Sequence, residues 1–198
     1  MDYLALFDKE LARARACTHA QLALHSCCAV CSSAVLELLS PHFEITVVYC
    51  NPNIFPLEEY DKRKSEQLRI IRETNWPNPI GVADLDYDHG EFLAVASGLE
   101  SEPEGGKRCE RCFELRMRAT ARYASEHSIS LFCSTLTVSP HKNAISVNAA
   151  GARAADEFGV NWLYSDFKKR DGYLRSIRLA QQHDIYRQRY CGCEFSAR

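Results

Sequence analysis

The spacing of hydrophobic positions along the chain switches repeatedly between extended and helical periodicity. Short apolar runs predict strands at residues 21–26, 43–50, 80–83 and 130–135, and the run at 43–50 is the clearest because it is rich in β-branched and aromatic residues. Apolar positions at helical spacing predict helices at residues 3–16, 29–39, 56–74, 88–99, 110–127 and 143–158. Strands that alternate with helices in this way are typical of a parallel sheet covered by helices. We therefore expect residues 1–198 to form a single α/β domain with a mostly parallel, Rossmann-like sheet.

The ends of the first two predicted strands carry the most conspicuous polar and sulfur-containing residues. Cys27 follows the first strand and precedes a helix, and Asn51 and Asn53 follow the second strand. In sheets of this kind, ligands bind beyond the carboxyl ends of the strands. We expect both loops to open on the same edge, where a site would lie.

Most of the ten cysteines fall into three short groups. They are Cys27-Cys28-x-x-Cys31, Cys109-x-x-Cys112 and Cys191-x-Cys193. The chain has no apolar run long enough to cross a bilayer and no recognisable secretory leader, so we expect a cytoplasmic protein with no membrane partner. In a reducing compartment, clustered cysteines more often bind metal or carry out redox chemistry than form structural disulfides. The isolated cysteines, which are Cys17, Cys50 and Cys133, sit in apolar stretches and are expected to be small buried hydrophobic residues.

The spacing within the first two groups indicates a metal centre. Cys109 and Cys112 lie near the start of a predicted helix, with the two-residue separation that redox, zinc and iron–sulfur sites all use. Cys27 and Cys28 are adjacent, and neighbouring side chains diverge too much to close easily around one zinc ion. An iron–sulfur cluster presents several irons, so adjacent thiolates can bind different ones. The pattern therefore favours a cluster over zinc.

The third group has a different chemical character. Cys191 and Cys193 flank a glycine, and such a pair can form a strained, easily reduced disulfide or chelate a metal. A dithiol supplies two electrons at once, whereas a cluster usually passes one. His25 precedes the first cysteine loop, where it either tunes the site or serves as an ordinary core residue.

The charge is distributed unevenly. Residues 1–160 contain 16 Lys and Arg against 22 Asp and Glu, a net charge of −6, while residues 161–198 contain 8 against 4, a net charge of +4. The basic residues of this tail are Lys168, Lys169, Arg170, Arg175, Arg178, Arg187, Arg189 and Arg198. A basic tail on an acidic body suits a polyanion such as RNA, and it is equally typical of a solvated helical face.

Several motifs, taken in order along the chain, resemble those of QueH-type epoxyqueuosine reductases. They are the segments 25–32 (HSCCAVCS), 49–54 (YCNPNI), 58–63 (EEYDKR), 108–113 (RCERCF), 135–143 (TLTVSPHKN), 166–168 (DFK) and 185–193 (IYRQRYCGC). Together they extend over nearly the whole chain. The resemblance implies reduction of epoxyqueuosine in tRNA to queuosine, the last step of queuosine biosynthesis, with the epoxide oxygen lost as water. It also implies a HUP-like sheet with the C-terminal cysteine-bearing segment closing over the site.

The resemblance further implies a set of cofactors and their ligands. A [4Fe-4S] cluster is expected on Cys27, Cys28, Cys109 and Cys112. Cys191 and Cys193 are expected to be a redox-active pair. A second, mononuclear iron is a further expectation, with Cys31 as a ligand together with Cys191 or Cys193. An electron donor of unspecified identity must supply the reducing equivalents.

The substrate contacts follow from residue type and position. The candidates are Asn51, Asn53, Lys142, Asn143, Tyr186, Arg187 and Tyr190. Polar groups after a strand suit a modified base or a phosphate, and aromatic residues beside an arginine suit single-stranded RNA. Helix capping or a surface pair is the alternative for each of them. For the whole protein, the alternative function is a non-catalytic, zinc-stabilised RNA-binding protein.

Overall fold

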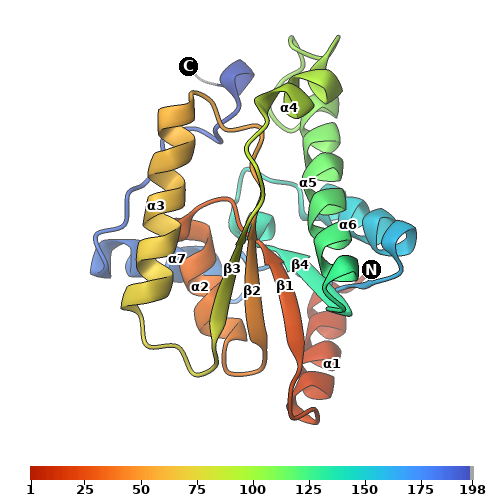
Figure 1. Cartoon of the computed structure of the whole chain (residues 1–198), viewed down its shortest axis with the longest axis vertical. Helices are drawn as coiled ribbons and strands as arrows, with labels where there is room; N and C mark the ends of the chain where they lie inside the picture. Colours follow the sequence, from red (N-terminus) through yellow and green to blue (C-terminus); the bar gives the residue numbers. More distant parts are fainter. Residues whose placement is uncertain (197–198) are drawn as a thin grey trace.

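A computed structural model describes residues 1–196 as a three-layer α/β domain (Figure 1). The central sheet has five strands in the order β3-β2-β1-β4-β5, and every neighbouring pair is parallel. The strands are β1 (Gln21–His25), β2 (Glu44–Tyr49), β3 (Ile80–Asp84), β4 (Leu131–Ser134) and β5 (Asn161–Trp162). The predicted parallel sheet is confirmed.

Helices cover both faces of this sheet. They are α1 (Tyr3–Arg15), α2 (Ala29–Leu39), α3 (Leu57–Glu73), α4 (His89–Ala96), α5 (Lys107–Glu126), α6 (Ala144–Phe158) and α7 (Gly172–Gln182), with short 3-10 turns η1 (Thr135–Val138) and η2 (Glu194–Ser196). In Figure 1, α2, α3 and α7 lie on one side of the sheet, and α5 and α6 lie on the other. No helix in the described part of the chain is both long and apolar enough to span a bilayer.

The buried strands explain why the sequence reads as continuous apolar runs. Leu22, Leu24 and Val47 are fully buried, because the central strands are covered on both faces.

The helix predicted at residues 110–127 begins earlier, at Lys107. Its N-cap is Gly106, which offers no side-chain oxygen, so the usual capping signal for a helix start is missing from the sequence.

Two elements were not predicted, and one cysteine was assigned wrongly. Strand β5 has only two residues and leaves no periodic pattern, and α7 lies in the stretch that we treated only as a basic tail. The expectation that Cys17 is buried is wrong: its side chain is exposed. Helix α1 ends at Arg15, and Cys17 falls in the following turn, beyond the buried stripe that the helix presents to the core. Cys50 and Cys133 are buried, as expected.

The carboxyl ends of the strands form the edge of the sheet on which the cysteines gather. In the parallel sheet, the loops that follow β1, β2 and β4 all open on this edge. We call residues 183–196 the C-terminal segment; it runs back from α7 past the start of α3 (Figure 1). The backbone N–H of Phe55, in the loop after β2, donates to the carbonyl oxygen of Gly192 at 2.9 Å. The C-terminal segment is thereby attached over the edge, as expected.

Candidate functional site

Three thiols converge at the turn between β1 and α2. The Sγ atoms of Cys27, Cys28 and Cys31 all lie within 4.8 Å of one another, and those of Cys27 and Cys28 are 3.9 Å apart. Cys28 is the N-cap of α2, and Cys31 lies in its first turn. A helix N-terminus stabilises negative charge, so this position favours thiolates. Such a group of soft sulfur donors fits a metal–thiolate centre.

A second set of cysteines comes from α5 and the C-terminal segment. Cys109 lies in the first turn of α5, and Cys112 follows three residues later on the same side of the helix. The backbone N–H of Gly105 donates to the Cys109 sulfur at 3.2 Å. Cys109 and Cys112 line a small cavity of about 30 Å³ together with Cys191 and Cys193.

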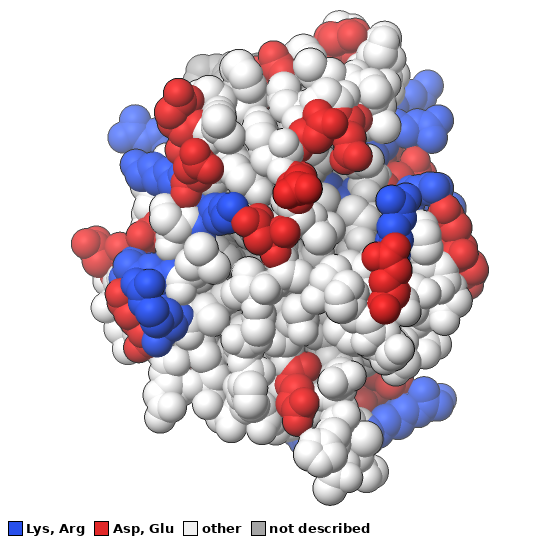
Figure 2. Space-filling view, viewed as in Figure 1, with Lys and Arg blue, Asp and Glu red and all other residues white. Residues whose placement is uncertain are grey.

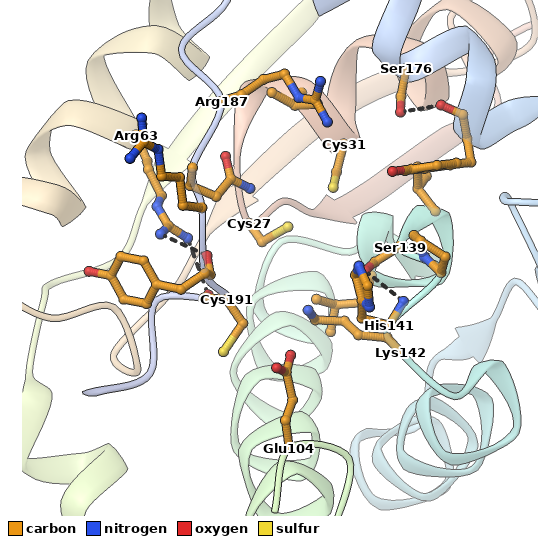
Figure 3. A pocket seen from close by; sticks show the side chains of 18 of the residues that line it. Cys27, Cys31, Arg63, Glu104, Ser139, His141, Lys142, Ser176, Arg187 and Cys191 are labelled. Carbon is orange, nitrogen blue, oxygen red and sulfur yellow. Dashed lines mark hydrogen bonds between the residues drawn. The ribbon is translucent and has the colours of Figure 1, made fainter. Parts of the chain in front are cut away.

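A larger cavity of about 410 Å³ adjoins the small one. Cys27 and Cys31 line it from one wall, and Cys191 lines it from the C-terminal segment (Figure 3). Cys191 and Lys142 line both cavities, so the two spaces are neighbours that share these side chains. Three segments far apart in sequence therefore bring their thiols around these two adjoining spaces, which together we call the cysteine cavity.

The positions of the sulfurs bear on which cysteines were predicted to bind a cluster and which to bind a second iron. The Cys31 sulfur lies within 4.8 Å of the sulfurs of both Cys27 and Cys28, so Cys31 belongs to this trio. Cys109 and Cys112 meet the two thiols of the C-terminal segment at the smaller cavity. Which of these sulfurs bind a cluster, and which bind a second iron, stays a prediction.

Two of the three thiol groups contain one sulfur whose pKa is lowered, whereas burial raises the pKa of both Cys109 and Cys112. Hydrogen bonds with Cys28 and Cys31 lower the pKa of Cys27 well below the usual thiol value, and the nearby charges of Arg116 and Lys142 lower it further. The hydrogen bond with Cys27 raises the pKa of Cys28 to about 11. In the C-terminal segment, a hydrogen bond from Cys193 and the ammonium group of Lys142 lower the pKa of Cys191 to about 5. Both of these sulfurs face the cysteine cavity.

Buried polar side chains hold the C-terminal segment in place. Arg63 donates to the carbonyl oxygens of Tyr190 and Cys191, at 3.2 Å in each case. Its own guanidinium is fixed by Glu59 at 2.7 Å. Gln188 donates to the Cys28 sulfur at 2.9 Å, so the segment touches the cysteine trio directly. The anchoring role of Arg63 could not be predicted from the sequence, because Tyr190 and Cys191 lie 127 and 128 positions away in the chain.

Of the asparagines predicted to contact substrate after the strands, two already form side-chain hydrogen bonds within the protein and one has an oxygen without a partner. The amide of Asn51 is occupied, because it donates to the Ser26 carbonyl at 2.8 Å and accepts from Arg116 at 2.6 Å. Asn143 caps α6 by accepting from the backbone N–H of Ile145 at 2.9 Å. Asn53 is buried against the smaller cavity, and its Oδ1 has no hydrogen-bond partner among the described residues.

Of the three residues of the C-terminal segment predicted to contact substrate, two lie at the larger cavity and one does not. Arg187 and Tyr190 line the larger cavity. Tyr186 is not among the residues that line it: its hydroxyl donates to Glu59 at 2.9 Å, and its ring lies 3.6 Å from the Lys62 ammonium.

The basic character of residues 161–198 is partly neutralised. Ion pairs join Lys168 to Asp166, Arg170 to Asp8 and Arg175 to Glu37. On the face drawn in Figure 2, acidic and basic side chains are intermixed. Arg187 and Arg189 instead line the cysteine cavity, while Arg198 lies outside the described residues. Arg187 and Arg189 therefore bring part of the positive charge of this stretch to the cavity.

Comparison with known proteins gives a consistent result over nearly the whole chain. Residues 22–198 match the family model described as Epoxyqueuosine reductase QueH. A relative of that name from Streptococcus pyogenes is 41% identical over 177 residues, covering 88% of this chain and 69% of the relative. One from Staphylococcus epidermidis is 41% identical over 183 residues, covering 89% and 76%. One from Thermotoga maritima is 32% identical over 176 residues, covering 87% and 88%.

Proposed function

The chain belongs to the epoxyqueuosine reductase QueH family, and we propose on that basis that it reduces epoxyqueuosine in tRNA to queuosine, the final step of queuosine biosynthesis. The reaction converts an epoxide to an alkene, consumes two electrons and two protons, and releases the oxygen as water. The whole chain, residues 1–198, would act as one domain.

The observation that carries this proposal is the convergence of thiols on the cysteine cavity. A reductive enzyme needs redox-active groups next to a space that admits its substrate. Here sulfurs from the trio and from the C-terminal segment line the same cavity of about 410 Å³. A cavity of this size is within the range of small-molecule sites.

We propose a [4Fe-4S] cluster on Cys27, Cys28, Cys109 and Cys112, which supplies electrons one at a time. Cys191 and Cys193 would serve as the two-electron carrier, because oxidation of a dithiol to a disulfide releases two electrons and two protons. A second iron held by Cys31 and one thiol of the C-terminal segment is the alternative use of these sulfurs. An external donor must reduce the protein after each turnover.

The polar residues of the cavity fit a nucleotide. Lys142, Arg187 and Arg189 line it and offer positive charge to phosphate groups. Tyr190 adds an aromatic ring on which an unpaired base can stack. Figure 3 shows Arg187, Lys142 and Cys191 around the same space. This combination suits a single-stranded anticodon nucleotide inserted from solvent.

The direct test uses anaerobic protein reconstituted with iron and sulfide. It is incubated with epoxyqueuosine-containing tRNA and a strong reductant, and the tRNA is then digested for nucleoside analysis. We expect queuosine to appear. Absence of queuosine while the metal centre is intact would contradict the proposal. A colourless, anaerobically purified protein that contains zinc would instead support the non-catalytic RNA-binding alternative.

A further inference from the structure

Arg116 places a positive charge inside the protein, directly beside the cysteines. It lies on α5 one helical turn after Cys112, so both side chains project from the same face. Its residue surface is only 2% exposed. The guanidinium donates through Nε to His25 at 3.2 Å and through Nη2 to Asn51 at 2.6 Å, and Nη1 lies 4.0 Å from the Cys112 sulfur.

The oxygen and nitrogen partners of this guanidinium are electrically neutral. Nε2 of His25 lies 3.2 Å from Nε of Arg116 and also 3.2 Å from the carbonyl oxygen of Cys50, and Nδ1 lies 2.8 Å from the Ser134 hydroxyl. An imidazole that accepts a hydrogen bond from a guanidinium carries no second ring proton and is therefore uncharged. Asn51 contributes only an amide oxygen. Neither residue compensates the charge of Arg116.

No carboxylate within residues 1–196 forms an ion pair with Arg116. The other buried arginines are satisfied differently. Arg63 is paired with Glu59 at 2.7 Å, and Arg108 donates to backbone carbonyls of the loop before α5. An isolated charge in a protein interior is strongly unfavourable unless an opposite charge lies close to it.

The sulfurs are the groups around Arg116 that become anions when they bind a metal. The nearest of them is the Cys112 sulfur, which lies 4.0 Å from Nη1 of Arg116. Arg116 also lines both parts of the cysteine cavity, between the trio and the sulfurs of α5. Its charge is therefore placed where a metal–thiolate centre with net negative charge would lie.

We propose that Arg116 is the fixed counterion of the metal–thiolate centre and raises the reduction potential of that centre. When one electron enters from a reductant, the net charge of the centre becomes more negative by one. A cation held close by in a medium of low dielectric constant favours this reduced form. Because a guanidinium keeps its proton at all ordinary pH values, the effect does not depend on pH. The inference rests on the proposed function in one respect, that the centre accepts electrons.

The test compares three substitutions in the anaerobic holoprotein, Arg116→Lys, Arg116→Gln and Arg116→Met. The potential is measured by a redox titration followed by electron paramagnetic resonance, and iron content is measured alongside. For Arg116→Gln and Arg116→Met, we expect at least a tenfold decrease in the equilibrium constant for one-electron reduction, which is about 59 mV. Arg116→Lys keeps the charge and should remain closer to the parent. As a control, Arg118→Gln removes an exposed arginine of the same helix and should leave the potential unchanged.

The reduction potential and the iron content of the variants each provide a way to contradict the inference. If Arg116→Gln and Arg116→Met retain the parent potential, the inference is wrong. If the uncharged variants lose iron, a counterion role predicts that lysine restores it and methionine does not. Equal restoration by methionine would mean that Arg116 acts only through packing, and the inference would fail. Neither readout uses tRNA, so a protein that forms no queuosine but shows these shifts would overturn the proposed function alone.

Discussion

The side chain of Arg63 donates a hydrogen bond to the backbone carbonyl oxygen of Cys191 at 3.2 Å, although the two residues are 128 positions apart. A second bond from the same guanidinium, to Tyr190, fixes the preceding peptide. The position of Cys191 is thus set through its backbone, which leaves its thiol free to face the cavity.

Replacement of Arg63 by lysine should loosen this attachment. Lysine cannot reproduce the two diverging bonds of a guanidinium, so one of the two carbonyl oxygens loses its donor. We expect faster hydrogen exchange of the amides in residues 186–193 and a decrease in queuosine formation of about tenfold or more, because small displacements of reacting groups are costly. Arg72→Lys, on the exposed side of the same helix, is the control. Unchanged exchange in the Arg63 variant would refute this anchoring role.

Gly192 is predicted to be intolerant of any side chain. It has φ +103°, and an added Cβ would lie 2.8 Å from Cγ1 of Ile54. The control is Gly98→Ala, since Gly98 also has a positive φ, +77°, but has open space around its Cβ position. Both variants bear the backbone strain, about 1–3 kcal/mol. Only Gly192→Ala should also displace the C-terminal segment and reduce turnover, as measured by urea unfolding and nucleoside analysis of each variant. Equal turnover in the two variants would argue against a tight fit at Gly192.

Substitution of single thiols should separate the two predicted roles. Cys191→Ser is expected to abolish queuosine formation while iron content and visible absorption stay close to those of the parent. Cys112→Ser should remove or degrade the cluster itself. Cys17→Ser, at an exposed position, should change neither property. Loss of the cluster in Cys191→Ser would instead identify Cys191 as one of its ligands.

Acid should weaken the start of the C-terminal segment through Glu66. Its carboxylate accepts from Arg69 at 2.9 Å and from the backbone N–H of Tyr186 at 3.0 Å. The bond from Arg69, followed by that from Tyr186, lowers the pKa of Glu66 below its ordinary value of 4.5. A carboxyl group with a depressed folded-state pKa stabilises the fold above its unfolded pKa, and this contribution disappears as the pH falls through the folded-state pKa.

The corresponding measurement is hydrogen exchange at Tyr186 in the parent and in Glu66→Ala. We expect the parent to be better protected at a pH of about 6 and the difference to shrink at a pH of about 3. Glu73→Ala removes the other carboxylate that contacts Arg69 without touching Tyr186, so it should leave this amide protected. A difference between parent and Glu66→Ala that persists at low pH would contradict the assignment.

Local patterns in the sequence predicted most of the sheet and its helices. Helix α2 was predicted at residues 29–39, the observed bounds, because a strand and a cysteine turn precede it and Ser40-Pro41 ends it. The start of α5 was missed because Gly106 carries no capping side chain, and β5 was missed because two residues form no pattern. These errors occur where tertiary contacts, rather than local propensity, determine the backbone.

The candidate site was likewise predictable from the sequence only in part. The three cysteine groups were visible in the sequence because thiols at short spacing are chemically distinctive. The contact of Arg116 with His25 was not visible, because it joins α5 to the end of β1 across 91 positions. Asn51 was predicted to contact substrate, yet its amide is bonded to Ser26 and Arg116. Only the folded arrangement reveals which polar groups are already occupied.

The C-terminal segment has a consequence for the order in which the protein is assembled. Synthesis proceeds from the N-terminus, so Cys27, Cys28, Cys31, Cys109 and Cys112 all emerge before Cys191. Until residues 183–196 have been made, the wall that they later form is missing, and the earlier thiols are accessible from that side. Metal delivered to the growing chain would therefore enter before closure, and residues 183–196 would then retain what has been inserted.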